Sequence, residues 1–528
     1  MTDHGKEDTP LIKRNKQVVL TPKGPDGCFQ QRYILSCLAF FGFFNVFALR
    51  VNLSVALVAM VNQTKLRLSV NTSDECDYER KNQTDPLNSR GEFNWSPETQ
   101  ELILAAFYYG YIITQIPGGL LAERYGGKWP FGIGVLATGV LTLLSPIVAK
   151  TSVYLFIALR VAVGLCEGLT FPSIHSMMGK WVPPLERSRL VSLAYSGMQI
   201  GVVVSQPISG LLCQYGFAGG WPSVFYVFGL CACVWFIFWC FLVYDSPYTH
   251  PRISAEEKEY ILTSIGDCEK HQEPTPWRHI LRSRSVWCLV VTHMCGSYGY
   301  HCLLTNLPTY MKTILHFNMN ENAFLSSLPY LMSFMTQWIA GAIADFLITK
   351  RILYTVTVRK LFTSLGMFGP AAFLFAAGYV GCNYAAAVIL LTLSISMNGF
   401  AVPGFLTNIV EIAPKFAGSV NGLVNTFGTA AGIISPAVVG ALTNNNQTQG
   451  QWRIIFIIAS CTAIFGGIVY IIFAKGEREF WSYSRKSVIY YHGLSDKERA
   501  RLLSIARKNH CKTVETNNKE YGTCETID

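Results

Sequence analysis

The chain is poor in charged residues for its length. Only 14% of its 528 residues are Asp, Glu, Lys or Arg, against roughly 25% in an ordinary soluble domain. The length alone would allow about three or four soluble domains of ~150 residues, but their surfaces need more charge than this composition supplies. The hydrophobic share of 50% instead indicates an integral membrane protein.

Patterns for metal, cofactor, nucleic-acid and enzyme chemistry are also missing. Most of the 16 cysteines lie in apolar runs without CxxC or Cys/His spacing, so we expect small core residues and no metal site. The net charge of +10 is spread over short hydrophilic gaps, which does not favour a nucleic-acid partner. No Ser/His/Asp set or phosphate loop occurs, so we expect no enzyme and no cofactor.

Twelve apolar stretches follow one another, each of a length that can cross a bilayer as a helix. They lie near residues 33–61, 99–122, 129–148, 152–178, 190–213, 222–244, 286–311, 324–347, 360–380, 384–408, 419–442 and 453–474. The first is too long for the core of a signal peptide, so no cleaved signal is expected. The predicted fold class is an all-α integral membrane protein with twelve transmembrane helices.

Basic residues and glycosylation sequons orient these helices independently. Lys and Arg gather in the even-numbered gaps, which places these gaps and both termini on the cytoplasmic side. N-x-S/T sequons fall in odd-numbered gaps, at Asn62, Asn71, Asn82, Asn94 and Asn446. Because glycosylation occurs only on the lumenal or extracellular face, the two signals agree, and we expect these asparagines to be glycosylated.

A longer cytoplasmic connection divides the spans into six and six. Within it, Ser254 and Glu257 form a capping box that predicts a short amphipathic helix. The predicted organisation is a tail, a six-helix bundle, a linker, a second six-helix bundle and a second tail, over residues 1–32, 33–244, 245–285, 286–474 and 475–528.

The second helix of each half ends in the same pattern. Gly119 precedes Glu123 and Arg124 in the first half, as Gly341 precedes Asp345 and two basic residues in the second. A glycine at such a position lets two helices approach closely. We therefore predict that the carboxylates and basic residues form a cytoplasmic charge latch.

The segment 119–128 resembles the loop 2–3 signature of the major facilitator superfamily, G-x-x-x-D-R-x-G-R-R, with Glu123 in place of Asp. Longer strings at 110–119, 183–189 and 411–414 resemble the organic-anion and phosphate transporter family of that superfamily, which includes vesicular glutamate transporters and sodium/phosphate cotransporters. The resemblance runs from about 33 to 480. It implies a cavity between two pseudo-symmetric bundles that opens alternately to each side.

Three charges lie within apolar helices, where each costs at least ~2.5–3.5 kcal/mol. We expect Arg50 to face the cavity and bind an anion, a role that the family resemblance also implies; the alternative is a structural ion pair. Arg160 is a candidate for substrate binding or for a structural role. Glu167, two helical turns further on, is the leading candidate for proton coupling, with a permanently ionised partner of an arginine as its alternative.

The chain departs from its family in helices 4 and 7. One member carries R-x-x-E-G-x-x-E-G in helix 4, but Val163 replaces the first glutamate here, so either Glu167 alone couples protons or the driving ion differs. In helix 7, Gly296 stands for the arginine of the glutamate transporters and His301 for a tyrosine, which disfavours glutamate as the principal substrate. His301 is a candidate to bind an anion or sense pH, or else a structural histidine.

Four further candidates follow from the same helices. Tyr111 and Tyr300 are predicted aromatic walls of the substrate site. Asn408 is predicted to keep a polar group toward the cavity, although the family histidine beside it is Ile409 here. His175 matches a family histidine and is a candidate for proton coupling, with packing as its alternative.

The N-terminal tail carries an acidic dileucine pattern at Glu7, Leu11 and Ile12, of the kind that clathrin adaptors read for delivery to lysosomes. Taken together, the buried charges, the family resemblance and the sorting pattern predict proton-coupled symport of a small organic anion out of lysosomes, either an acidic sugar or an acidic amino acid. The alternative is a sodium-coupled importer of phosphate or organic anions at the plasma membrane, which Val163 keeps open.

Overall fold

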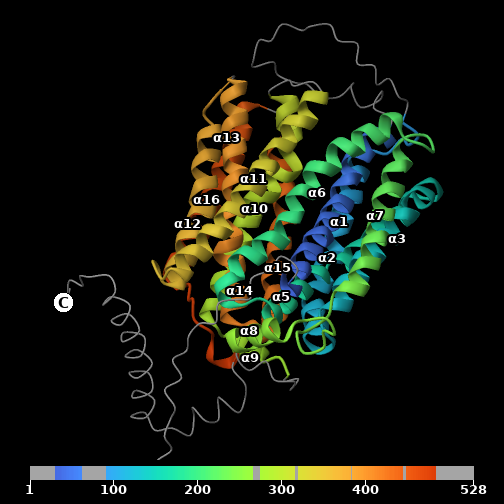
Figure 1. Cartoon of the computed structure of the whole chain (residues 1–528). Coiled ribbons are helices and arrows are strands. Elements are labelled where there is room, and N and C mark those ends of the chain that lie inside the picture. The colour runs from blue at the N-terminus through green and yellow to red at the C-terminus, as the bar shows by residue number, and fades with distance from the viewer. Residues whose placement is uncertain are drawn as a thin grey trace, which may run out of the picture.

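The computed structural model describes residues 30–61, 91–265, 274–314, 319–381, 383–443 and 448–482. Within these ranges the chain is helical, and its only β contact is an isolated bridge between Val61 and Phe93. In Figure 1 the first half, coloured blue to green, lies beside the second half, coloured yellow to red, and the long helices run along a common direction.

Each half contributes six spans. The first half contains α1 (Gln31–Met60), α2 (Pro97–Tyr125), α3 (Lys128–Thr151), α4 (Val153–Glu167) continued by α5 (Thr170–Trp181), α6 (Arg187–Tyr215) and α7 (Trp221–Leu242). The second contains α10 (Arg284–Thr313), α11 (Met319–Thr349), α12 (Thr355–Ala377), α13 (Tyr384–Met397) continued by α14 (Thr407–Ile412), α15 (Ala417–Thr443) and α16 (Gln449–Phe473). The predicted twelve-helix membrane fold is confirmed.

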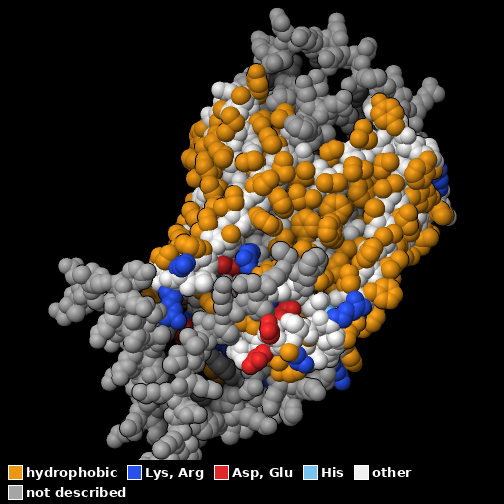
Figure 2. All heavy atoms as spheres, viewed as in Figure 1, with side chains coloured by type: hydrophobic (Ala, Val, Ile, Leu, Met, Phe, Trp, Pro, Cys, Tyr) orange, Lys and Arg blue, Asp and Glu red, His pale blue; other side chains and the backbone are white. Residues whose placement is uncertain are grey.

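The surface of the bundle fits a hydrocarbon environment. Nine segments of the described chain are long and apolar enough to cross a membrane, and α2, α6 and α10 supply three further helices of similar length. Large apolar side chains such as Ile147, Leu211 and Phe241 are exposed along the sides. Figure 2 shows hydrophobic side chains over most of this face, with Lys, Arg, Asp and Glu gathered toward the end where α8 and α9 lie. Such a surface is stable only against lipid.

The two halves meet chiefly through two helix pairs, α2 with α15 and α6 with α11, and α5 also packs on α15. Small residues permit both contacts. A Cβ atom on Gly119 would lie 2.5 Å from the Gly418 carbonyl oxygen, and one on Gly341 would lie 2.7 Å from Ser192 Oγ. The halves are therefore in tight contact at the predicted cytoplasmic end, with each second helix packed against a helix of the opposite half.

Two spans that the sequence pattern predicts as single helices are broken. The fourth span is interrupted between Glu167 and Thr170, where Pro172 cannot donate to the carbonyl four residues earlier. The tenth passes from α13 through a 3₁₀ turn (Asn398–Ala401) and a π turn (Val402–Leu406) into α14. Pro403 lacks a donor, and Gly404 has a non-helical ψ of −112°, so this break also follows from a local backbone limit.

The linker contains α8 (Ala255–Ile265) and α9 (Trp277–Ile280). The predicted capping box forms in part, because the Glu257 N–H donates to Ser254 Oγ at 3.2 Å. The Glu257 carboxylate, however, accepts from the backbone N–H groups of Gln31 and Arg32, at 3.0 and 3.2 Å. It thus caps α1 instead of its own helix and ties α8 to the first half. Next to it, burial raises the pKa of Tyr260 to about 12.

Candidate functional site

The charged residues predicted in α1 and α4 form an ion pair at the centre of the first half. The Nε atom of Arg50 donates to Glu167 Oε1 at 2.9 Å, and a second guanidinium nitrogen bonds the same oxygen. Arg50 is 10% exposed and Glu167 is fully buried. The second oxygen, Oε2, is buried without a hydrogen-bond partner among the residues that the structure describes. Glu167 therefore has one committed oxygen and one that is available.

Three aromatic rings surround the Arg50 guanidinium and form an aromatic cage that holds it in place. Its Cζ atom lies 4.8 Å from the Phe47 ring centroid, 4.7 Å from that of Phe107 and 4.8 Å from that of Tyr111. Cation–π contacts of this kind stabilise an arginine without cancelling its charge. Tyr111, predicted as an aromatic wall of the substrate site, therefore lies directly against Arg50, the residue predicted to bind the anion.

Arg160 adds a second cation to the same region. It is 3% exposed, its Cζ lies 5.6 Å from the Phe107 ring, and it interacts electrostatically with Glu167. Its Nε is buried without a hydrogen-bond partner in the described ranges. Within those ranges, Glu167 forms an ion pair with Arg50, and no carboxylate lies within ion-pairing distance of Arg160. Two buried arginines thus accompany one buried carboxylate, which gives the cluster a surplus positive charge.

Tyr300 and His301 approach this region from α10 in the other half. The His301 ring lies 6.1 Å from Tyr108 of α2, edge to face, and 5.6 Å from Tyr300. Its Nδ1 donates to the Ser297 carbonyl at 2.9 Å, which leaves Nε2 for another partner. An aromatic contact between the halves therefore lies beside the ion pair.

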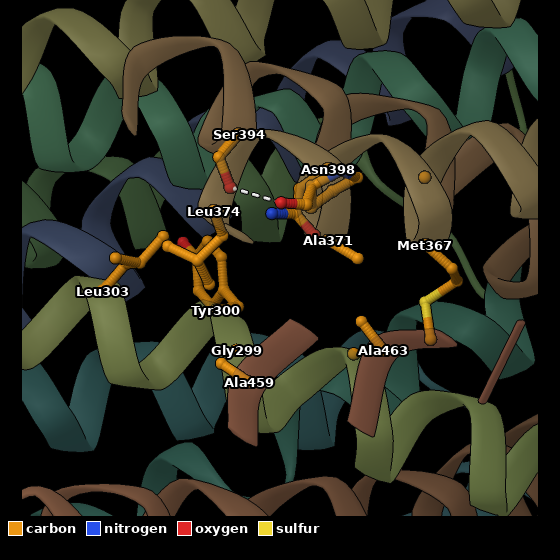
Figure 3. A pocket seen from close by; sticks show the side chains of 13 residues that line it. Gly299, Tyr300, Leu303, Met367, Ala371, Leu374, Ser394, Asn398, Ala459 and Ala463 are labelled. Carbon is orange, nitrogen blue, oxygen red and sulfur yellow. Dashed lines mark hydrogen bonds between the residues drawn. The ribbon is translucent and has the colours of Figure 1, made fainter. Parts of the chain in front are cut away.

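Behind Tyr300, the second half encloses a cavity of about 20 Å³ between α10, α12, α13 and α16, which is about the space of one water molecule. Figure 3 shows Tyr300 and Leu303 on one side of it and Met367 on another, with the Asn398 amide close by. Ser394 donates to the Pro370 carbonyl at 3.1 Å and so leaves little polar surface in the lining. This cavity is separate from the Arg50–Glu167 pair.

A polar bridge connects α2 to α15 next to the aromatic cage. Asn425 Nδ2 donates to the Tyr111 hydroxyl at 3.2 Å and to Gln115 Oε1 at 3.0 Å, while its Oδ1 lies 3.2 Å from His293 Nε2. Neither Asn425 nor Gln115 was predicted as a site residue from the sequence. The available signal was an amide side chain within a mostly small or apolar stretch of each helix.

His175 lies at the interface of the halves and not beside Glu167. It is buried on α5, with Nδ1 2.7 Å from the Tyr195 hydroxyl and Nε2 3.3 Å from the Asn421 amide nitrogen of α15. Asn421 is one helical turn before Asn425. The two asparagines of α15 therefore each contact a histidine, one in each half.

Asn408 lies inside the second bundle. It is buried and donates from Nδ2 to the Tyr470 hydroxyl of α16 at 2.8 Å. A buried tyrosine hydroxyl needs a partner, and this contact supplies it. The structure does not bring Asn408 together with Arg50, Arg160 and Glu167, whereas the sequence analysis placed its polar group toward the cavity.

The two predicted latch carboxylates cap helices of the opposite half. Glu123 of α2 accepts from the Ser419 N–H and hydroxyl of α15, both at 2.7 Å, and from the linker Thr275 hydroxyl at 3.0 Å. Asp345 of α11 accepts from the N–H groups of Ser188 and Arg189 of α6, at 2.9 and 2.7 Å. A carboxylate at a helix N-terminus satisfies free donors and favours the helix dipole.

Of the remaining latch residues, Gly119 lies at the α2–α15 contact described above, and Arg124 lies 5.5 Å from the neighbouring Tyr125 ring. Asn94 is exposed just before α2. The other sequons and the sorting motif lie outside the described residues, at Asn62, Asn71, Asn82 and Asn446 and at Glu7, Leu11 and Ile12.

A second buried ion pair reinforces the contact between the halves. Arg359 of α12, fully buried, bonds Glu411 with two nitrogens, at 2.9 and 2.5 Å. A third nitrogen, Nη1, donates to Ser188 Oγ of the first half at 2.8 Å and to the Pro403 carbonyl at 2.5 Å. This role of Arg359 was not predicted, because Arg359 ends a short basic gap and its surroundings in the sequence are those of an ordinary cytoplasmic loop residue.

Two six-helix halves, two broken spans and a buried charged cluster in the first half, beside its contact with the second, are the features of a secondary transporter. The chain belongs to the major facilitator superfamily, whose sequence profile matches residues 35–436. It is a multi-pass membrane protein from a superfamily of transporters.

Relatives place the chain within the organic-anion and phosphate transporter family and confirm that resemblance. It is 46% identical to human sialin over 475 residues, which is 90% of this chain and 94% of sialin. It is 40% identical to a putative inorganic phosphate cotransporter of Drosophila melanogaster, with 87% of each chain covered. It is 36% identical to vesicular glutamate transporter 3 of Danio rerio, over 90% of this chain and 80% of the relative. These matches support a secondary transporter of organic anions.

Solved structures agree on the fold. A proton:xylose symporter of the same superfamily, bound to 6-bromo-6-deoxy-D-glucose, superimposes with a TM-score of 0.64 over 85% of this chain and 97% of that chain. The sequences are 16% identical, so this likeness concerns the fold alone.

Proposed function

We propose that the protein is a proton-coupled symporter that moves a small organic anion, with an acidic sugar as the favoured class, out of an acidic compartment. The observation that carries the proposal is the surplus positive charge of the buried cluster, where two arginines, Arg50 and Arg160, accompany one carboxylate, Glu167. An anion with one carboxylate would neutralise that surplus. A buried surplus charge is costly, so the cluster favours anion binding.

The Arg50–Glu167 pair also links proton binding to anion binding. While Glu167 is ionised, it occupies Arg50. A proton on Glu167 cancels the ion pair and frees the guanidinium for the anion. Each ligand therefore favours the other, which is the thermodynamic requirement for symport. The partner-free Oε2 atom supplies a place for the proton that does not require the Arg50 contact to break first.

The alternative is a sodium-coupled importer of phosphate or organic anions at the plasma membrane. Val163 supports it, because this buried apolar residue stands where one family member carries a second glutamate. The similarity to a putative inorganic phosphate cotransporter points the same way. A driving ion other than the proton would leave Glu167 as a fixed partner of Arg50.

Lysosomal residence is part of the proposal. It is supported by the acidic dileucine pattern at Glu7, Leu11 and Ile12, which clathrin adaptors would read, and by the similarity to sialin. A position in an acidic organelle would place the proton gradient in the direction that drives export from the lumen.

The test is uptake of labelled sialic acid, glutamate, aspartate and phosphate into proteoliposomes, with a proton gradient or a sodium gradient imposed separately. We expect sialic acid uptake that depends on the proton gradient and not on sodium. Phosphate uptake that requires sodium would replace the proposal with the alternative, and the lysosomal exporter assignment would fall.

A further inference from the structure

Asn425 touches the aromatic cage of Arg50 from the opposite half. It lies on α15, while Tyr111 and Gln115, which accept its two amide hydrogens, lie on α2. Tyr111 in turn holds its ring 4.8 Å from the Arg50 Cζ. The position of Tyr111, which contacts the proposed anion-binding residue Arg50, therefore depends on a helix of the other half.

All of the hydrogen-bonding atoms of the Asn425 side chain are used. Both hydrogens of its Nδ2 go to the first half, so its Oδ1 accepts from His293 Nε2 at 3.2 Å. His293 also packs against Phe405 of the π turn, at 5.5 Å between ring centroids. An aspartate at this position would lose both donors, and a leucine would lose all three contacts. The arrangement is specific for an amide.

The contacts of Asn425 with Tyr111 and Gln115 exist only while α15 is packed on α2. A Cβ atom on Gly422, between the start of α15 and Asn425, would lie 2.5 Å from the Gln115 carbonyl oxygen, so the helices touch along this stretch. Opening the cytoplasmic side by alternating access requires these two helices to separate there. Separation removes the hydrogen bonds from Tyr111 and Gln115.

We propose that Asn425 is a positioning residue that fixes the Tyr111 ring against Arg50 only while the cytoplasmic side is closed, so that the anion site is complete toward the lumen and loosened toward the cytoplasm. The inference rests on the proposed function in one respect, namely that Arg50 binds the transported anion. It goes further by giving the transporter a difference in affinity between its two faces. Such a difference favours release on the cytoplasmic side.

The test compares Asn425→Leu, which keeps the volume, with Asn425→Gln, which keeps the amide. Labelled sialic acid is the probe, and apparent affinity is measured separately at each face of proteoliposomes of one orientation. We expect Asn425→Leu to raise the KM at the lumenal face roughly two- to tenfold, the range for losing the one hydrogen bond that holds Tyr111, with little change at the cytoplasmic face. Asn425→Gln should recover part of the loss.

Two further variants separate positioning from general damage. Tyr111→Phe removes the acceptor hydroxyl and keeps the ring, so the double variant with Asn425→Leu should be no worse than the more impaired single variant. Thr426→Val is the matched control, because the Thr426 hydroxyl donates only to the Gly422 carbonyl of its own helix, at 2.7 Å. Equal losses at both faces, or fully additive effects in the double variant, would overturn the proposal.

A readout that needs no substrate keeps the test independent of the proposed function. Hydrogen exchange of the backbone amides of residues 107–115 should quicken in Asn425→Leu and stay unchanged in Thr426→Val. If the unaltered protein takes up no sialic acid but exchange responds in this way, the choice of substrate fails and the role of Asn425 stands. Unchanged exchange in Asn425→Leu would refute that role.

Discussion

The carboxylate of Glu123 provides the sharpest test of how the cytoplasmic side is closed. Replacing Glu123 by alanine leaves the N–H of Ser419 at the start of α15 without its acceptor and also removes the bond from Thr275. A capping side chain contributes about 0.5–2 kcal/mol, and a negative charge at a helix N-terminus adds about 0.3–1 kcal/mol. The closed state should therefore lose about 1–3 kcal/mol. Since 1.4 kcal/mol is a tenfold change, the ratio of closed to open molecules should fall by roughly 5- to 150-fold.

The assay is energy transfer between two fluorophores on the cytoplasmic end, one at the end of α2 in the first half and one directly before α10, the first helix of the second half. Tyr125 at the end of α2 and Arg282 just before α10 are exposed and suit labels carried by unnatural amino acids, which leave the native cysteines untouched. We expect Glu123→Ala to move the distribution toward longer separations. The separations in Glu123→Gln should fall between those of the unaltered protein and those of Glu123→Ala, because the glutamine amide oxygen still accepts from the Ser419 N–H but the charge is gone.

The symmetric variant supplies the control. Asp345 caps α6 from the other half as Glu123 caps α15, so Asp345→Ala should shift the same distribution in the same direction. If Glu123→Ala leaves the distribution unchanged while the folded protein is present in normal amount, the carboxylate does not stabilise the closed state and the reasoning is refuted.

Three other substitutions test the buried charges. Arg50→Ala should abolish sialic acid uptake in proteoliposomes while the protein remains folded in the membrane, and normal uptake would exclude Arg50 as the anion ligand. Glu167→Gln should make the remaining uptake insensitive to an imposed pH gradient, so full retention of gradient-driven uptake would reject its role as proton carrier. Arg359→Leu leaves Glu411 buried without its cation and should cost about 3–5 kcal/mol of stability, seen as a lower Tm. The double variant Arg359→Leu/Glu411→Leu should recover most of that Tm, and failure to recover would show that the loss comes from packing.

The positions of the helices could be predicted from the sequence because lipid demands long apolar runs. The longer hydrophilic connection over residues 245–285 then separated the chain into two halves. The pattern at Gly119 and Glu123, and its echo at Gly341 and Asp345, also led to a contact that the structure contains, since glycine spacing and a terminal carboxylate are local signals.

The partners of buried side chains could not be predicted in the same way. Arg50 and Glu167 are 117 residues apart, and hydropathy does not reveal how each helix is rotated about its axis. The same limit explains Asn408, which faces Tyr470 inside the second bundle. Asn425 was missed because the sequence does not show that the helix face it shares with Asn421 packs against the other half. Such contacts depend on how two helices from different halves are packed together.

The π turn in the tenth span is linked through Arg359 to the contact between the two halves. Because the turn departs from the α-helical ladder, the Pro403 carbonyl is available to Arg359, whose same nitrogen reaches Ser188 in the other half. Arg359 therefore links the bend of this span to the contact between the halves. When the halves separate at Ser188, Arg359 loses one of its hydrogen bonds and holds the π turn less firmly. The conformation of the tenth span would then depend on whether the cytoplasmic side is closed or open.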